Sequence, residues 1–230
     1  MEPFVDVATA RALDARALNE LGVPSLVLME SAGAAAAEAL CAWWGTDAQT
    51  ALPHVLVLCG AGHNGGDGFV VARRLVDRVA HVTLVCVHEQ EALVPDAQVM
   101  QRAALGVGVV LVRTLDELDR LVQREPRATP YVVVDAVLGT GARSPVAGIA
   151  AALLQWMARH AERMPVVALD LPSGLDGDTG AADPLTPVAA LTVTFGLAKR
   201  GLQCGQGPRV CGRVVVADLG LPRSFRWRPS

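Results

Sequence analysis

The sequence predicts an α/β protein in which helices cover both faces of a mostly parallel β-sheet. From residue 54 onward, short continuous apolar runs alternate with helical segments. Continuous apolar runs are typical of strands buried on both faces, and strand–helix alternation builds parallel βαβ units. Polar loops directly follow three of the runs, at the edge where such sheets bind ligands. These observations predict a three-layer α/β/α sandwich of the Rossmann-like type.

Length and composition indicate a single domain over residues 1–230. The chain has 52% hydrophobic residues, enough for a full core, and it shows no internal repeat, low-complexity linker or abrupt change of charge. A net charge of −3 and only 4% aromatic residues argue against nucleic-acid binding, which needs basic surfaces or stacking platforms. Nucleic acid is therefore not an expected partner.

The cysteines and the N-terminus favour a cytoplasmic protein. None of the five cysteines forms a Cys-x-x-Cys pair, and their spacing indicates no disulfide framework, which suits a reducing compartment. The N-terminal residues are acidic and lack the basic segment of a signal peptide. The longest apolar stretch, residues 26–44, is interrupted by Glu30, Ser31 and Glu38, so no membrane span is expected.

Two helices are predicted before the first strand. Apolar residues recur at helical spacing in residues 9–21, and Gly22 is typical of the residue that ends a helix. Pro24 suits a first helical turn, and the second helix is expected to run to Trp44. Its small residues, 33–37, would let another helix or a second subunit approach closely; the alternative is that the helix only covers the sheet.

The remaining elements alternate along the chain. Seven apolar runs are predicted strands: residues 55–58, 82–85, 107–112, 131–134, 166–169, 191–195 and 214–216. Helices are predicted between them at residues 67–77, 95–105, 115–123 and 147–162. A glycine-rich turn with no clear helix is expected between the last two strands.

The first of the three polar loops, residues 60–68, carries the pattern Gly-x-Gly-x-x-Gly from Gly60 to Gly65. Glycines between a strand and a helix let backbone N–H groups approach a phosphate, although a plain turn has the same pattern. The further glycines would cost about 1 kcal/mol each inside a helix, which favours a binding role. Asn64 offers an amide oxygen to a hard cation, whereas Asp67 suits a helix N-terminus but repels phosphate.

The other two loops begin with an acid. Asp135 opens the loop 135–141, whose Gly-Thr-Gly run offers a backbone cradle for an anion. Asp170 opens the loop 170–178, which holds three acids. Helix capping and turn formation are the alternative explanations for these residues. Because the carboxyl ends of parallel strands share one edge, we expect all three loops to converge there.

Lys199 follows the sixth predicted strand and is the only lysine among 20 basic residues. A sole lysine indicates a need for a compact ammonium rather than a planar guanidinium, although chance explains one residue equally well. Several chemistries are excluded, because the chain has no P-loop, no Gly-x-Ser-x-Gly elbow and no His-Glu-x-x-His. Its five histidines are scattered, which argues against a zinc site.

Taken in order along the chain, several segments resemble the NAD(P)H-hydrate epimerases, the family of YjeF N-terminal domains. The resemblance rests on residues 28–33, 60–74, 135–141, 170–180, 194–201 and 218–222. The pairing of Asn-Gly-Gly-Asp-Gly with Asp-x-Pro-Ser-Gly-x-Asp is highly specific. The resemblance implies that the protein interconverts the R and S forms of hydrated NADH and NADPH. An S-specific dehydratase can then restore the cofactor. Since the chain ends soon after Pro222, we expect a stand-alone epimerase, a homodimer that works beside a separate dehydratase.

The resemblance also implies the site residues. Potassium is the expected cofactor, with oxygen ligands from Asn64, Asp135 and Ser173. The expected substrate-binding residues are His63, Asn64, Gly65, Gly66, Asp67, Gly139, Thr140, Gly141, Ala142, Arg143, Ser144, Pro145, Asp170 and Lys199. His63 stands where the family usually has asparagine. Asp170 is the expected catalytic acid–base, with Asp67 second, and Lys199 is a candidate for binding a phosphate.

The expected reaction passes through a transient cation. Loss of the hydroxyl from a carbinolamine carbon gives an iminium, and water then adds to its other face, which requires acid–base catalysis and a negative field. Two alternatives stay open: a catalytically silent binding or scaffold module, and a Rossmann-type oxidoreductase or methyltransferase. Intact acids in all three loops argue against the first. The lack of a clear ribose-binding acid after the second strand argues against the Rossmann-type oxidoreductase or methyltransferase.

Overall fold

The computed structural model describes residues 4–45, 53–124, 130–141 and 144–226. At its centre lies one sheet of seven strands in the order β3-β2-β1-β4-β5-β6-β7. The strands are β1 (His54–Cys59), β2 (His81–Val85), β3 (Val110–Val112), β4 (Tyr131–Ala136), β5 (Val166–Leu169), β6 (Ala189–Phe195) and β7 (Arg213–Ala217). Every neighbouring pair of these strands is parallel, which confirms the predicted sheet.

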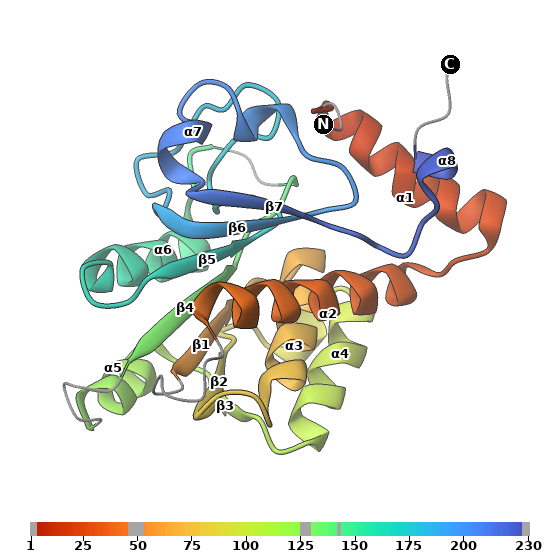
Figure 1. Cartoon of the computed structure of the whole chain (residues 1–230). Helices are drawn as coiled ribbons and strands as arrows, with labels where there is room; N and C mark the ends of the chain where they lie inside the picture. Colours follow the sequence, from red (N-terminus) through yellow and green to blue (C-terminus); the bar gives the residue numbers. More distant parts are fainter. Residues whose placement is uncertain (1–3, 46–52, 125–129, 142–143, 227–230) are drawn as a thin grey trace.

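Helices lie on both faces of the sheet (Figure 1), so the predicted three-layer sandwich is confirmed. One face is covered by α2 (Ser25–Trp44), α3 (His63–Leu75) and α4 (Pro95–Gly106), and the other by α5 (Leu115–Arg124) and α6 (Gly148–His160). The first helix, α1 (Val7–Leu21), lies beside α8 (Arg223–Arg226) near the C-terminus. The remaining short elements are η1 (Gln90–Ala92), η2 (Arg200–Leu202) and α7 (Gly207–Val210).

Three predicted boundaries were wrong. α3 begins at His63 rather than Asp67, so the Asn-Gly-Gly-Asp-Gly run is helical and not a loop. β3 is shorter than predicted, because residues 106–108 end α4 and turn through Gly108, whose φ is +88°. The glycine-rich turn before β7 contains a short helix, α7, with Pro208 in its first turn.

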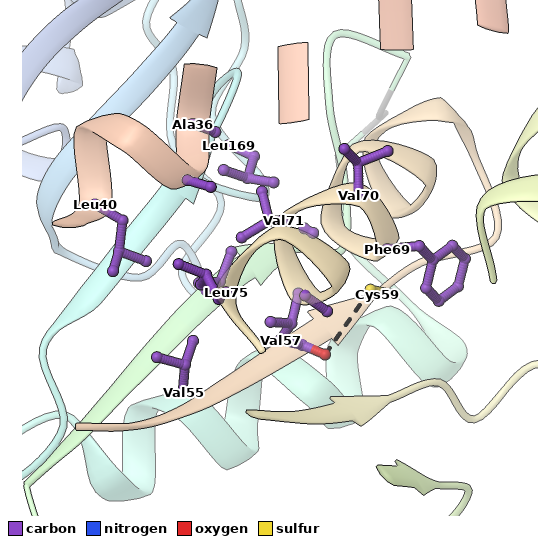
Figure 2. Close-up of a cluster of buried hydrophobic side chains, with 14 of the residues drawn as sticks. Ala36, Leu40, Val55, Val57, Cys59, Phe69, Val70, Val71, Leu75 and Leu169 are labelled. Atoms are coloured by element: carbon purple, nitrogen blue, oxygen red, sulfur yellow. Dashed lines mark hydrogen bonds between the residues drawn. The ribbon is translucent and has the colours of Figure 1, made fainter. Parts of the chain in front are cut away.

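The larger core lies between the sheet and the helices α2, α3 and α4. Figure 2 shows side chains of α2, α3, β1 and β5 gathered in this core. All six residues of β1 are buried, which explains its continuous apolar sequence. Gly33 of α2 lies so close to α3 that an added Cβ would stand 2.4 Å from Cβ of Val70. Gly33, together with the buried Ala36 and Ala37, therefore serves packing within one chain.

The apolar sequence of α2 follows from the same packing. By length and composition alone, this helix is apolar enough to cross a membrane. Its Met29, Ala36 and Leu40, however, are buried in the core against α3 and the sheet. Glu30, on the same helix, binds the guanidinium groups of Arg73 and Arg74 of α3, which ties the two helices together at the surface.

α1 docks at the carboxyl edge of the sheet. Val5, which precedes α1, forms a parallel bridge with Lys199, which follows β6. Leu13 of α1 belongs to an apolar cluster with Leu28 of α2 and Leu219, which follows β7. These contacts hold one face of α1 beside the ends of the strands, where ligands bind in parallel sheets.

Candidate active site

A cavity of about 910 Å³ opens at this edge, and segments far apart in the sequence line it. The lining comes from α1, α2, the turn between β1 and α3, the loop after β4, and residues that follow β5 and β6. The predicted site residues that line it are His63, Asn64, Asp67, Gly139, Thr140, Gly141, Asp170 and Lys199. The three predicted loops thus meet at one cavity.

Close backbone packing explains the glycines between β1 and α3. A Cβ on Gly60 would stand 2.0 Å from the carbonyl oxygen of Val137, and one on Gly65 would stand 1.9 Å from the carbonyl oxygen of Gly60. A Cβ on Gly66 would stand 2.5 Å from the sulfur of Met29. Gly65 and Gly66 thus pack against the protein itself and are not among the residues that line the cavity.

Asp135 lies fully buried near the end of β4. Its Oδ1 accepts hydrogen bonds from Ser173 Oγ at 2.5 Å and Val137 N at 3.2 Å, and its Oδ2 accepts one from Ser173 N at 2.8 Å. Burial raises the pKa of Asp135 to about 6, although these hydrogen bonds oppose the rise. Among the described residues no basic side chain pairs with this carboxylate, so a cation beside it would stabilise its charge.

The peptide groups of Leu138 join the three predicted potassium ligands. Its N–H donates to Ser173 Oγ at 2.8 Å, and its carbonyl oxygen accepts from Asn64 Nδ2 at 3.0 Å. Oδ1 of Asn64 is buried and has no hydrogen-bond partner in the part of the chain that the structure describes. Burying an unpartnered amide oxygen is costly. Together with the hydroxyl and carboxylate oxygens nearby, it forms a donor set that fits a hard monovalent cation.

Asp170 forms a buried ion pair with the only lysine. Lys199 Nζ donates to Oδ1 of Asp170 at 2.6 Å, to Oγ1 of Thr194 at 3.2 Å and to the carbonyl oxygen of Phe195 at 3.0 Å. Three acceptors match the three protons of an ammonium group. Because these bonds lie within the chain, the phosphate contact expected of Lys199 stays a prediction.

The backbone of Asp170 is strained. Its φ is +66°, a left-handed conformation that is uncommon outside glycine. Such a conformation persists where the surrounding structure enforces it, and it occurs often at functional sites. Here the N–H of Asp170 donates to the carbonyl oxygen of Val193 at 2.8 Å, and the ion pair with Lys199 holds the side chain.

Two further carboxyl groups face the cavity. Asp67 of α3 is buried, and burial, followed by the charges of Asp170 and Asp14, raises its pKa well above the usual range. Desolvation at the cavity wall also raises the pKa of Asp14, which the charge of Lys199 opposes. Neither carboxyl forms a hydrogen bond or salt bridge with any residue that the structure describes. The ammonium of Lys199 therefore lies near three carboxyl groups, those of Asp170, Asp67 and Asp14, and the surroundings of these carboxyl groups differ.

The loop after β4 contributes fewer residues to the cavity wall than predicted, among those that the structure describes. Gly139, Thr140 and Gly141 line the cavity, whereas Ala142 and Arg143 lie outside the described residues. Ser144 Oγ donates to Oδ2 of Asp183 at 3.0 Å. Neither Ser144 nor Pro145 lines the cavity, so their substrate contacts stay predictions.

Three titratable residues that line the cavity were not among the predicted site residues: Arg11 and Asp14 of α1 and His88 after β2. Arg11 and Asp14 are three positions apart and therefore share one face of a helix. That spacing is visible in the sequence, beside the apolar Leu13. Only the docking of α1 at the carboxyl edge shows that this face looks into the cavity.

Known proteins are similar to this chain over nearly its whole length. An NAD(P)H-hydrate epimerase of Weissella koreensis is 34% identical over 95% of this chain and 93% of its own length. A bifunctional NAD(P)H-hydrate repair enzyme Nnr of Moorella thermoacetica is 39% identical over 96% of this chain. This chain spans only 41% of that bifunctional relative.

The fold and the family agree. The crystal structure of the yeast protein ynu0 superposes with a TM-score of 0.83 over 97% of this chain and 91% of the yeast chain. Its sequence identity is 24%, so this likeness concerns the fold. The family model described as the YjeF-related protein N-terminus matches residues 25–201, a range that contains Asp67, Asp135 and Asp170. The chain therefore belongs to the family of YjeF-related protein N-termini.

Proposed function

We propose that this protein is an NAD(P)H-hydrate epimerase, which interconverts the R and S forms of hydrated NADH and NADPH in cofactor repair. The observation that carries the proposal is the match to a stand-alone protein of that name over 93% of its length, at 34% identity. The cavity supports it, because its volume of about 910 Å³ lies within the range of small-molecule and cofactor sites.

The chemistry needs one proton donor and one proton acceptor. The C–O bond of the hydrated carbon breaks as its hydroxyl takes a proton and leaves as water, and the ring nitrogen supplies the electron pair that forms the iminium. Water then adds to the other face and loses a proton. Carboxylates around the cavity stabilise the positive charge of this intermediate.

Asp67 and Asp170 suit these two tasks because their surroundings differ. Asp67, buried with a raised pKa, carries the proton that the leaving hydroxyl takes. Asp170, paired with Lys199, is a carboxylate and accepts the proton of the water that adds. The reverse reaction uses the two groups in the opposite sense, which agrees with a reversible epimerisation.

A coupled assay tests this function. An S-specific dehydratase is added to a mixture of both hydrates, and the fraction that escapes repair is followed with and without this protein. Complete repair, faster than spontaneous epimerisation allows, is the expected result. Incubation with NADPH and carbonyl compounds as hydride acceptors should oxidise no NADPH, whereas an oxidoreductase that reduces one of these acceptors would oxidise it. With a catalytically silent module, the R form would be repaired only at the spontaneous rate.

Potassium, held by Asn64, Asp135 and Ser173, is the second part of the proposal. The unpartnered Oδ1 of Asn64 and the buried carboxylate of Asp135 support it. The ion would supply positive charge that holds the start of α3 to the loops after β4 and β5. Because these segments also carry Asp67, Thr140 and Asp170, they would position the cavity wall.

The proposed working state is a cytoplasmic homodimer beside a separate S-specific dehydratase. Gly33, Ala36 and Ala37 of α2 are buried within the chain, so the better candidates for a subunit contact are the apolar residues exposed nearby. Leu18 and Leu21 of α1 and Val27 of α2 are 51%, 47% and 50% exposed. Sedimentation at micromolar concentration tests the dimer, and a monomer there would reject it.

A further inference from the structure

We infer that Arg11, on the inner face of α1, binds the diphosphate of the substrate and thereby fixes which way the dinucleotide lies in the cavity. The inference rests on the proposed function, because hydrated NADH and NADPH supply the diphosphate. It concerns a helix that precedes all three loops predicted to form the site.

Acidic and basic groups of the cavity lie at opposite ends of the Gly139–Gly141 segment, in the loop after β4. At the first end, a Cβ on Gly139 would stand 3.4 Å from Oδ2 of Asp170. At the other end, a Cβ on Gly141 would stand 3.6 Å from Nη2 of Arg11. The run from Gly139 to Gly141 therefore leads from the acidic end of the cavity to the guanidinium of Arg11.

Among the described residues that line the cavity, Arg11 is the basic side chain that is available to a ligand. It is exposed, and within the described ranges no group forms a hydrogen bond or ion pair with it. The ammonium of Lys199, in contrast, is buried and already has three acceptors. Burial lowers the pKa of His88, so this cavity residue is neutral at neutral pH. His63 lies near enough to Asp14 to lower its pKa, and so belongs to the acidic end.

This distribution orients the substrate. The diphosphate carries negative charge and is repelled by the carboxyl groups around Asp170, whereas a guanidinium can pair two hydrogen bonds with phosphate oxygens. The nicotinamide ring becomes cationic during epimerisation and is stabilised at the acidic end, beside Asp67 and Asp170. Arg11 thus binds the part of the substrate that does not react.

The test compares Arg11→Gln with Arg102→Gln, a matched loss of charge at an exposed residue of α4 that does not line the cavity. Arg11→Gln should raise KM for the hydrate by about tenfold or more, because a charge-assisted hydrogen bond to phosphate is lost. kcat should stay within about twofold of wild type, since this contact is the same in the ground and transition states. Arg11→Lys should recover part of the affinity. Arg102→Gln should match wild type.

Calorimetric titration with NADP⁺ provides a readout that does not depend on turnover. Arg11→Gln should weaken binding by a factor similar to the rise in KM, and it should reduce the dependence of affinity on salt. An unchanged KM and NADP⁺ affinity, or a loss confined to kcat, would overturn the inference. If the wild-type protein shows no epimerisation, the proposed function fails instead, and the NADP⁺ titrations still decide whether Arg11 binds the dinucleotide.

Discussion

The ammonium of Lys199 lies 2.6 Å from Oδ1 of Asp170, and the two residues follow neighbouring parallel strands. Lys199 is 4% exposed and Asp170 is 8% exposed, so water stabilises neither charge well and each depends on the other. The ammonium also reaches Thr194 and the carbonyl oxygen of Phe195. A compact donor with three protons suits three acceptors on different sides, which gives a physical reason for lysine here.

Asp170→Asn is expected to slow epimerisation at least about 100-fold, because general acid–base catalysis typically contributes about 10²–10⁴-fold. The change also leaves Lys199 buried without its counter-ion, which is expected to destabilise the fold by about 3 kcal/mol. The coupled assay, measured above the spontaneous rate, and denaturant unfolding check the two effects.

The double variant Asp170→Asn/Lys199→Gln separates catalysis from stability. It should recover much of the lost stability, because no unpaired charge remains buried, and it should stay inactive. Near-normal turnover of Asp170→Asn, together with loss in Asp67→Asn, would leave both proton transfers to Asp67 and remove Asp170 from the mechanism. Activity in both single variants would reject the carboxylate mechanism.

Asp67→Asn is expected to abolish most activity and to stabilise the protein at pH 8. Burial raises the pKa of Asp67 in the folded state, so ionisation favours the unfolded chain increasingly as pH rises. An amide of similar size removes that penalty. At pH 3, below its ordinary pKa of 3.8, the carboxyl is largely protonated in both the folded and the unfolded chain, so variant and wild type should be about equally stable. A variant less stable than wild type at pH 8 would contradict the raised pKa.

Asp135 predicts a second pH effect, which potassium should reduce. Its pKa is about 6 in the folded state against 3.8 ordinarily, so the unfolded chain releases its proton first. Without potassium, stability should therefore fall as pH rises from about 4 to 6, by up to about 3 kcal/mol from this group. Potassium bound to the carboxylate would favour its charged form and flatten this fall.

Thermal unfolding in KCl and NaCl at several pH values measures both effects. Asp135→Asn should remove the part of the pH dependence that this residue causes, as well as the preference for KCl, because the only full charge among the proposed ligands is lost. A preference for KCl that survives in the variant would show that potassium binds elsewhere.

Gly60→Ala is expected to destabilise the protein by about 1–3 kcal/mol or to prevent folding, since the added Cβ would stand 2.0 Å from a backbone oxygen. Gly62→Ala is the control. Gly62 lies two residues further on, and nothing stands within 4 Å of its added Cβ. Equal stability of the two variants, measured by denaturant unfolding, would refute the packing explanation of this glycine.

Local sequence patterns were sufficient for the architecture and for much of the candidate site. Buried strands such as β4 and β5 are continuous apolar runs because both of their faces are covered, and this pattern does not depend on what covers them. Parallel order then places the loops after them at one edge. Asp135, Asp170 and Asn64 could therefore be selected together, although they are far apart in the sequence.

Only the tertiary structure decided what these residues contact. The start of α3 at His63 could not be predicted, because the cost of Gly65 and Gly66 in a helix is offset here by close packing on Gly60 and Met29. Nor could the sequence show that Lys199 pairs with Asp170, or that α1 turns Arg11 and Asp14 toward the cavity. The periodicity of apolar residues predicts which face of a helix or strand is buried. The segment that packs on that face is set by contacts between residues far apart in the sequence, and a local pattern does not predict these contacts.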